Sequence, residues 1–322
     1  MLGLFYAGIR NKEVTDENAF QCLLCGRCKQ VCPVGINTTG IRVSQRRLFS
    51  EEYKTDFNYI NATKSLTTDI LYFAGCMGHL TPGVSEAMKF IFNKAGLNYR
   101  FMDEDGSICC GRPLLLTGDS NGAKQLMEKN KEIINRSGAK YLVTSCPTCY
   151  KVFSEDYNLP VKVLHHTQFL NFLIKSKRIE LAAIQQTAVY HDPCELGRGS
   201  GIYEEPREVL ENIVKLINTD DQKEHSLCCG GSLGNLLISM DNRNAIIKQA
   251  YNTLTVNNPE LLVTSCPLCK KTFSKVAGIQ VSDIAELVAK SIHNYQKAII
   301  RIPEPQKEKD TVLHAGIISY AK

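Results

Sequence analysis

The amino-acid sequence predicts an α/β protein made of two similar units with mainly parallel sheets, which follow a small helical segment. Short apolar runs alternate with helical patterns, as they do where crossover helices join parallel strands. The hexapeptide LVTSCP occurs at 142–147 and again at 262–267, and the cysteines repeat in the same order around both copies. Such self-similarity at a fixed spacing indicates a duplicated structural unit.

Composition narrows the class of protein. The 322 residues are 43% hydrophobic and 22% charged, which is ordinary for a globular protein with room for two domains. The net charge of +5 comes from scattered basic residues, so nucleic acid is not an expected partner. The amino terminus does not resemble a signal peptide, and no apolar run reaches the ~18 residues that a membrane helix needs. We therefore expect a cytoplasmic protein that meets a membrane only through a partner.

The alternation can be followed along the chain. Apolar runs that end just before Cys76, Cys146 and Cys194 predict buried parallel strands. Ligands of parallel sheets gather beyond the carboxyl ends of the strands, where these cysteines are expected. Helical patterns cover 84–96, 121–138, 206–217 and 242–254.

Fourteen cysteines are the most informative feature of the sequence. A chain of this size without an export signal has little need of disulfides, and the C-x-x-C and adjacent pairs suit a metal or a cluster. The run CLLCGRCKQVCP at 22–33 has the C-x2-C-x2-C-x3-C-P spacing of a ferredoxin [4Fe–4S] site. Its candidate ligands are Cys22, Cys25, Cys28 and Cys32.

The role of Cys32 has two interpretations. In two-cluster ferredoxins the fourth cysteine of such a run ligates the other cluster, but this chain has a single run. Either Cys32 closes its own cluster, which we favour because every other cysteine has a better use, or another group does. The single run also suggests that a second ferredoxin cluster lies on a partner subunit.

The remaining cysteines form two matching groups. Each group has a lone cysteine, a Cys-Cys-Gly triplet and a C-x-x-C pair: Cys76, Cys109, Cys110, Cys146 and Cys149, and then Cys194, Cys228, Cys229, Cys266 and Cys269. Five thiolates exceed what tetrahedral zinc or an ordinary cubane cluster uses, which favours a larger or differently shaped iron–sulfur cluster. Adjacent thiolates that converge need an irregular backbone, which Gly111 and Gly230 would permit.

These two repeats resemble the CCG domains of heterodisulfide reductase catalytic subunits, and the ferredoxin run resembles the small iron–sulfur subunit of that enzyme. HDPCELGRGSGIYEEPREVL at 191–210 is similar to the family around the first cysteine of its second repeat. The resemblance implies an α/β fold with two pseudo-symmetric CCG domains after a half-ferredoxin domain. It also implies a [4Fe–4S] cubane and two noncubane [4Fe–4S] clusters beside a site where a disulfide is cleaved.

The resemblance leaves a second function open. The family contains iron–sulfur subunits of flavin-linked glycolate, lactate and glycerol-3-phosphate dehydrogenases, which pass electrons towards quinone. In some members one CCG site is altered or resembles a zinc site. This chain keeps all ten repeat cysteines, which favours two clusters and a disulfide-type substrate, although Ser232 and Leu233 interrupt the glycine-rich stretch after the second triplet. No nucleotide-binding glycine motif occurs, so electrons are expected from a flavoprotein or a further iron–sulfur subunit.

Several other side chains are candidates for a role beside the clusters. His191 and His79 lie close to cluster cysteines in the sequence and could donate hydrogen bonds or a proton. Arg198 could bind an anionic group of a substrate or form a surface ion pair. His165 and His166 follow a predicted strand, where a surface role is expected. The catalytic candidates are thus His191 and Arg198.

The sequence suggests four segments. They are a ferredoxin-like domain at 1–65, CCG domains at 66–184 and 185–300, and a tail at 301–322 that begins rich in proline and charge. The tail is expected to fold back on the protein or to bind a partner. A basic helix is expected at 41–53, either solvated or serving as a docking surface.

Overall fold

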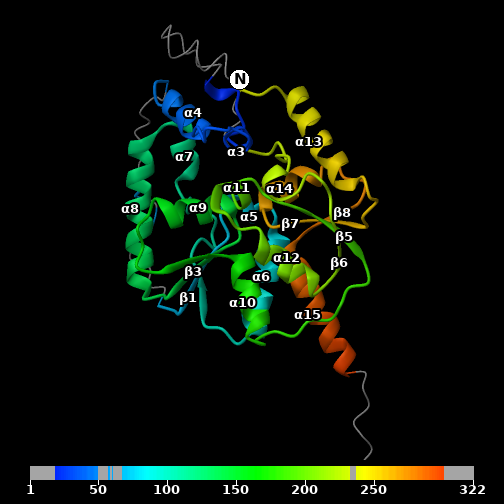
Figure 1. Ribbon diagram of the computed structural model, residues 1–322. Coiled ribbons are helices and arrows are strands. Elements are labelled where there is room, and N and C mark those ends of the chain that lie inside the picture. The colour runs from blue at the N-terminus through cyan, green and yellow to red at the C-terminus, as the bar shows by residue number, and fades with distance from the viewer. Residues whose placement is uncertain (1–18, 50–56, 59, 61–66, 233–236, 301–322) are drawn as a thin grey trace, which may run out of the picture.

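A computed structural model of the chain describes residues 19–49, 57, 58, 60, 67–232 and 237–300. The expected tail at 301–322, the end of the expected helix at 41–53, and Leu233 lie outside the described residues. The described residues form two similar halves, which Figure 1 shows side by side beneath a small helical segment.

The first half contains a four-stranded parallel sheet with strand order β2-β1-β3-β4. Its central strands consist of short apolar runs and are largely buried, as the sequence predicts. The elements of this half are β1 (Ile70–Phe73), α5 (Cys76–His79), α6 (Pro82–Lys94), β2 (Tyr99–Phe101), α7 (Arg112–Thr117), α8 (Ser120–Ser137), β3 (Tyr141–Thr144), α9 (Pro147–Glu155), β4 (Lys162–His165) and α10 (His166–Lys175).

The second half repeats this plan, with a parallel sheet of order β6-β5-β7-β8. Equivalent strands occupy equivalent places, so the predicted α/β class and the duplication are confirmed. The elements are β5 (Thr187–His191), α11 (Gly197–Ser200), α12 (Glu204–Glu211), β6 (Lys215–Ile217), the 3-10 turn η1 (Lys223–His225), α13 (Met240–Thr255), β7 (Leu261–Thr264), α14 (Pro267–Phe273), β8 (Gln280–Asp283) and α15 (Ile284–Ile300).

One predicted helix is partly wrong. The helical pattern at 206–217 ends at Glu211, and Lys215–Ile217 forms β6 instead. The backbone N–H of Val214 still bonds to the carbonyl of Leu210, after which the apolar residues pair with β5. The helices predicted at 84–96, 121–138 and 242–254 agree with α6, α8 and α13 to within two residues.

The two halves share a hydrophobic core. Helices α6 and α10 of the first half pack against α15 and α12 of the second, and Figure 1 shows these helices between the two sheets. Phe92, Leu170, Leu210 and Val288 are among the buried side chains of this shared core. Burial of large apolar side chains at about 1.5–3 kcal/mol each is the main force that holds the halves together.

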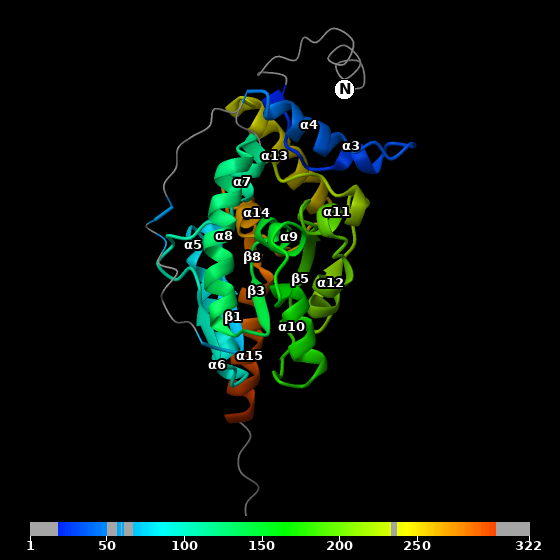
Figure 2. The ribbon, with the colours of Figure 1, turned by 90° about the vertical axis from the view of Figure 1, so that its left-hand side faces the viewer.

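The amino-terminal segment lies beyond the carboxyl ends of the strands. It contains α3 (Arg27–Gln30) and α4 (Thr38–Arg46), which both views place at the top of the molecule (Figures 1 and 2). Arg46 is completely buried and donates hydrogen bonds of 3.0 Å to the carbonyls of Ala19, Cys22 and Leu116. The expected basic helix therefore ends at Arg46, and this arginine fixes the segment on the first half instead of meeting solvent.

Close approach at one glycine strengthens that attachment. Gly118 has a φ of 100°, and a Cβ atom there would lie 2.9 Å from the backbone of Arg47.

Among the described helices, none is both long enough and apolar enough to cross a bilayer.

Candidate metal centre

The strand ends position the first cysteines of each group. Cys146 and Cys266 follow β3 and β7 in extended conformation and are the N-cap residues of α9 and α14, with a proline at the start of each helix. The second cysteine of each C-x-x-C pair then falls in the first helical turn. The motif C-P-x-C thus brings two thiols together at the carboxyl end of a parallel strand.

In the first half, all five predicted cysteines come together. The Cys110 thiol is hydrogen-bonded to those of Cys109 and Cys149, and Cys149 is also bonded to Cys146. Charges on Cys146 and Cys110 act on Cys76, which completes the group. The structure therefore brings together the set that the sequence predicted, whereas their role as metal ligands remains a proposal.

Backbone geometry makes room for this group. Gly111 has a φ of 85°, and its counterpart Gly230 has a φ of 75°, which is the irregular backbone expected after the adjacent cysteines. A further glycine at this site, Gly75, was not predicted from the sequence. A Cβ atom on Gly75 would lie 2.9 Å from the Sγ atom of Cys149, so only glycine leaves this approach to the thiols open.

The second half gathers the equivalent five cysteines and one more. Cys228 is hydrogen-bonded to Cys194 and Cys229, and Cys269 is bonded to Cys229 and Cys266. Cys228 is also bonded to a cysteine of the amino-terminal run, Cys25. A cavity of about 30 Å³ lies beside this group and is lined in part by Pro147 and Thr148 of the first half.

The thiols do not share one protonation state. The hydrogen bond from Cys109 lowers the pKa of Cys110 well below its ordinary value, and the bond from Cys228 does the same to Cys229. Burial raises the pKa of Cys76 to about 11. Each repeat therefore stabilises a thiolate on the second cysteine of its triplet, and thiolate is the form that binds iron.

The two groups lie close enough for a charge in one to act on the other. The hydrogen bond with Cys269 lowers the pKa of Cys266, burial raises it, and the charge of Cys146 in the other half raises it further, so that it is raised overall. All fourteen cysteines lie in the described part of the chain, and no disulfide joins them there.

The amino-terminal cysteines lie in a tight loop. Leu24 and Gly26 both have positive φ values, and backbone N–H groups of Leu24 and Ile36 donate to the Sγ atoms of Cys22 and Cys32 at 3.4 Å. The hydrogen bond with Cys228 lowers the pKa of Cys25 to about 6. Whether Cys32 closes a cluster in this loop stays a prediction.

Arg198 joins this loop to the second half. Its Nε atom donates to the carbonyl of Cys25 at 2.9 Å, and its Nη1 atom donates to those of Ser226 and Glu224 at 2.7 and 3.1 Å. These contacts make Arg198 a clamp between the two cysteine groups. Its predicted role in binding a substrate anion stays a prediction.

The histidines fall into different environments. His191 is buried beneath the second group, where Nε2 donates to the carbonyl of Leu227 at 3.2 Å and Nδ1 faces Thr264 at 3.4 Å. Burial lowers the pKa of His191, so it is neutral and positions neighbouring backbone. His79 is partly exposed and lies 3.3 Å from Asp103, and this hydrogen bond raises its pKa.

The expected surface role of His165 and His166 is wrong. Both side chains are completely buried, because the second half covers the carboxyl end of β4. Nothing in the sequence of the first half alone could reveal this burial, which arises from the packing of the two repeats.

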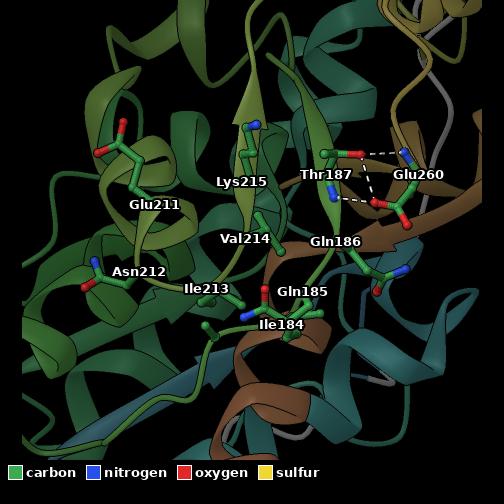
Figure 3. A pocket seen from close by; sticks show the side chains of 11 residues that line it. Ile184, Gln185, Gln186, Thr187, Glu211, Asn212, Ile213, Val214, Lys215 and Glu260 are labelled. Carbon is green, nitrogen blue, oxygen red and sulfur yellow. Dashed lines mark hydrogen bonds between the residues drawn. The ribbon is translucent and has the colours of Figure 1, made fainter.

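A larger pocket lies away from the cysteines. Its volume is about 450 Å³, and Figure 3 shows Ile184, Val214 and Lys215 around it, at the amino ends of β5 and β6. Thr187 donates to the Glu260 carboxylate through its backbone N–H and its hydroxyl group, at 2.7 and 2.9 Å. No cysteine lines this pocket, so the cysteine groups at the opposite ends of the strands are the candidate functional site.

Comparison with known proteins agrees with this site. The profile of the family described as "CCG: Cysteine-rich domain" matches residues 70–154 and 188–274, which contain the two cysteine groups. The chain is 30% identical over 331 residues to a subunit of the dihydromethanophenazine:CoB–CoM heterodisulfide reductase of Methanosarcina barkeri. That match covers 87% of this chain and 79% of the relative.

Two further relatives are oxidoreductase proteins. A subunit of the fumarate reductase (CoM/CoB) of Methanothermobacter marburgensis is 25% identical over 85% of this chain and 61% of its own length. The EtfAB:quinone oxidoreductase of Syntrophomonas wolfei is 28% identical over 70% of this chain and 34% of its own length. The chain therefore belongs to the CCG cysteine-rich domain family and is a relative of the subunits of heterodisulfide reductase-like iron–sulfur oxidoreductases.

Proposed function

We propose that the chain is the disulfide-reducing iron–sulfur subunit of a heterodisulfide reductase-like enzyme. In this proposal a [4Fe–4S] cluster receives electrons, and two noncubane [4Fe–4S] clusters in the CCG domains deliver them to a disulfide or a related sulfur substrate. The observation that carries the proposal is the proximity of the two five-cysteine groups, in which Cys146 of one half acts on Cys266 of the other.

The residues of both groups fit such clusters. Four thiols of the first group and all five of the second are linked by hydrogen bonds, one thiol of each triplet is poised as thiolate, and Gly75 keeps the approach to Cys149 clear. A bound cluster supplies one electron at a time. The proposed ligands are Cys22, Cys25, Cys28 and Cys32 for the amino-terminal cluster, Cys76, Cys109, Cys110, Cys146 and Cys149 for the first half, and Cys194, Cys228, Cys229, Cys266 and Cys269 for the second.

Two facing sites suit the chemistry of a disulfide. Cleavage of one S–S bond takes two electrons and leaves two thiolates, which two protons convert to thiols. If each half delivers one electron, neither has to hold both. Pro147 and Thr148 of the first half line the small cavity beside Cys194 and Cys228, so both halves meet next to the second cysteine group.

The contact between Cys25 and Cys228 gives electrons a short path. It joins the amino-terminal run to the second half, so electrons are expected to enter that half first. Residues 19–49 contain no aspartate or glutamate, and Val31 and Val34 are 64% and 76% exposed beside Lys29. Such a basic and apolar surface is suited to an acidic partner, which we propose to be a flavoprotein or a further iron–sulfur subunit.

A second function is supported by one of the relatives. The EtfAB:quinone oxidoreductase is named for a reaction that passes electrons to quinone. Under this alternative the chain transfers electrons for a flavin-dependent 2-hydroxyacid or glycerol-3-phosphate dehydrogenase, and it binds no disulfide. One CCG site holding zinc in place of a cluster is compatible with this alternative.

Disulfide reduction by reduced viologen distinguishes the two functions. The anaerobic protein is tested with the CoB–CoM heterodisulfide and with a panel of other small disulfides. Cys109→Ala and Cys228→Ala should each abolish the activity, and the double variant should be no worse, because the two groups act as a unit. Ser107→Ala, an exposed change close to Cys109, is the control. Wild-type protein that carries electrons between partners but reduces no disulfide would support the alternative.

A further inference from the structure

The carboxyl ends of the two edge strands carry equivalent helix caps. His165 ends β4 and caps α10, and its backbone N–H donates to Gln168 at 3.2 Å. Asp283 ends β8 and precedes α15, and its backbone N–H donates to Glu286 at 2.8 Å. The repeats thus place a histidine and an aspartate at the same position of the fold, paired in register with Thr144 and Thr264.

The two caps meet through the next residue of the first half. The Nε2 atom of His166 lies 3.2 Å from the Oδ1 atom of Asp283, and both side chains are completely buried. A buried charge this far from water needs a partner. The Oδ1 atom of Asp283 accepts a hydrogen bond from the backbone N–H of Ala285 at 2.9 Å, and the ionisable ring of His166 lies next to it. Four nearby polar atoms have no hydrogen-bond partner in the described residues: His165 Nε2, His166 Nδ1 and Nε2, and Asp283 Oδ2.

This buried pair lies behind both cysteine groups. The hydroxyl groups of Tyr72 and Tyr190 are 2.8 and 2.6 Å from those of Ser145 and Ser265, the residues that directly precede Cys146 and Cys266. The charge of Asp283 acts on both tyrosines. The charge of the pair therefore acts on the tyrosines that hold the residues next to Cys146 in the first half and Cys266 in the second.

Hydrogen bonding fixes the protonation state of one of the two histidines. The Nδ1 atom of His165 accepts hydrogen bonds from the N–H and the hydroxyl group of Thr167, so His165 caps its helix as a neutral ring. Burial, and then the neighbouring His166, hold the pKa of His165 well below its ordinary value. The ring of His166 instead faces the Asp283 carboxylate, at 3.2 Å, so a proton bound there would lie between the ring and the carboxylate.

We propose that the His166–Asp283 pair is a proton-binding site that takes up one proton from solvent with the first electron that enters the facing cysteine sites. The inference rests on the proposed function, since it requires redox clusters at those sites. Each electron, which a low-potential one-electron donor supplies, adds a negative charge where little water screens it. One proton on the pair changes its net charge from −1 to zero and offsets the added electron.

Other ionisable groups face the pair from every neighbouring element, but each is already engaged. Tyr72 and Tyr190 are bonded to serines, and His165 caps α10. The half-buried Tyr150 stands edge-on to His165, with ring centroids 6.0 Å apart, and marks the nearest surface. The acidic residues on adjoining helices are bound to other side chains: Glu286 to Lys270, Glu205 to Gln168, and Glu208 to Asn171 and Lys175.

The test is the pH dependence of the reduction potential of the CCG clusters, measured by redox titration with EPR detection on the anaerobic full-length protein. In the wild type the potential for the first electron should fall by about 59 mV per pH unit, the value for one proton per electron. Asp283→Asn keeps a good helix cap but removes the carboxylate, so this slope should be lost. His166→Gln should lose it as well, which keeps the test decisive if either variant folds poorly.

Asp119→Asn is the matched control, because Asp119 is also a buried N-cap aspartate, on α8. It should keep the wild-type slope. A wild-type potential that does not change with pH, or variants that keep the slope, would overturn the inference while leaving the clusters and the proposed function intact. Absence of an iron–sulfur signal from the CCG sites would overturn the proposed function and this inference with it.

Discussion

The thiols of Cys25 and Cys228 are in hydrogen-bonding contact, although one belongs to the amino-terminal run and the other to the triplet of the second repeat. The amino-terminal cysteine run and the cysteine group of the second repeat are therefore neighbours in space. Arg198 closes the same junction, because it donates to the carbonyl of Cys25 and to that of Ser226. The two repeats are thus not equivalent, since this contact joins the run to the second repeat.

This contact predicts unequal effects of two cysteine changes. Cys25→Ser should remove the amino-terminal cluster and also alter the EPR signal of the second CCG site, because the Cys25 thiol contacts Cys228. Cys28→Ser is the matched control in the same run, and it should affect the amino-terminal cluster only. The two EPR spectra should differ from one another. If they are identical, the Cys25–Cys228 contact has no effect on the second site.

Cys32 provides a separate test of the amino-terminal cluster. Cys32→Ser should lose or destabilise that cluster and spare the other two, if Cys32 closes it. Iron content and the EPR signal of the reduced protein measure the effect. An unchanged cubane signal would mean that Cys32 serves another cluster or none, and that the fourth ligand lies elsewhere.

Arg46 should contribute strongly to stability. Arg46→Met keeps the length and the apolar body of the side chain but leaves three carbonyls without their donor. We expect a loss of about 3 kcal/mol in the free energy of unfolding, at about 1 kcal/mol or more for each buried acceptor. Chemical denaturation of the anaerobic protein measures it, with the exposed Lys248→Met as the control. A loss no larger than that of the control would contradict the structural role of Arg46.

Acid should destabilise the protein through its buried histidines. Burial lowers the pKa of His165 and of His191, so the unfolded chain binds more protons than the folded one below the ordinary histidine value of about 6.5. Their stabilisation is complete above that pH and is lost as the pH falls, by about 1.4 kcal/mol per pH unit for each histidine. His79 acts in the opposite sense, because its bond to Asp103 raises its pKa, and its contribution is lost as the pH rises.

His191→Phe isolates one part of this slope. The equivalent residue of the first repeat is Phe73, which packs edge-on against Phe153 as His191 does against Phe273. The variant should reduce the acid slope by one proton, measured as the free energy of unfolding at a series of pH values below 6.5. The same slope in both proteins would show that His191 does not carry the effect.

The features that recur in both repeats could be predicted from the sequence. Cysteine spacing alone identified both groups of five, and the apolar runs identified β1, β3, β5 and β7 because buried parallel strands are nearly all apolar. Among the edge strands, β4 was predicted from the apolar run before His165, whereas β6 was missed, since it is three residues long and its run Lys215–Ile217 extends a helical pattern. The predicted domain boundaries near 65, 184 and 300 stay a prediction.

Contacts between segments could not be predicted. The burial of His166 depends on Asp283 of the other repeat, and the contacts of Arg198 depend on the loop that carries Cys25. Each arises from the way the repeats and the amino-terminal segment pack, for which a single sequence carries no local pattern. The same holds for Arg46, whose burial is invisible in a basic stretch.

Iron content tests the central claim most directly. Protein purified without oxygen should contain about twelve iron atoms per chain, four for each of three clusters, with a matching amount of acid-labile sulfide. About eight iron atoms and one zinc would mean that one CCG site is a zinc site and that electrons pass through the other alone. About four iron atoms, with no metal in either group of five cysteines, would contradict the account.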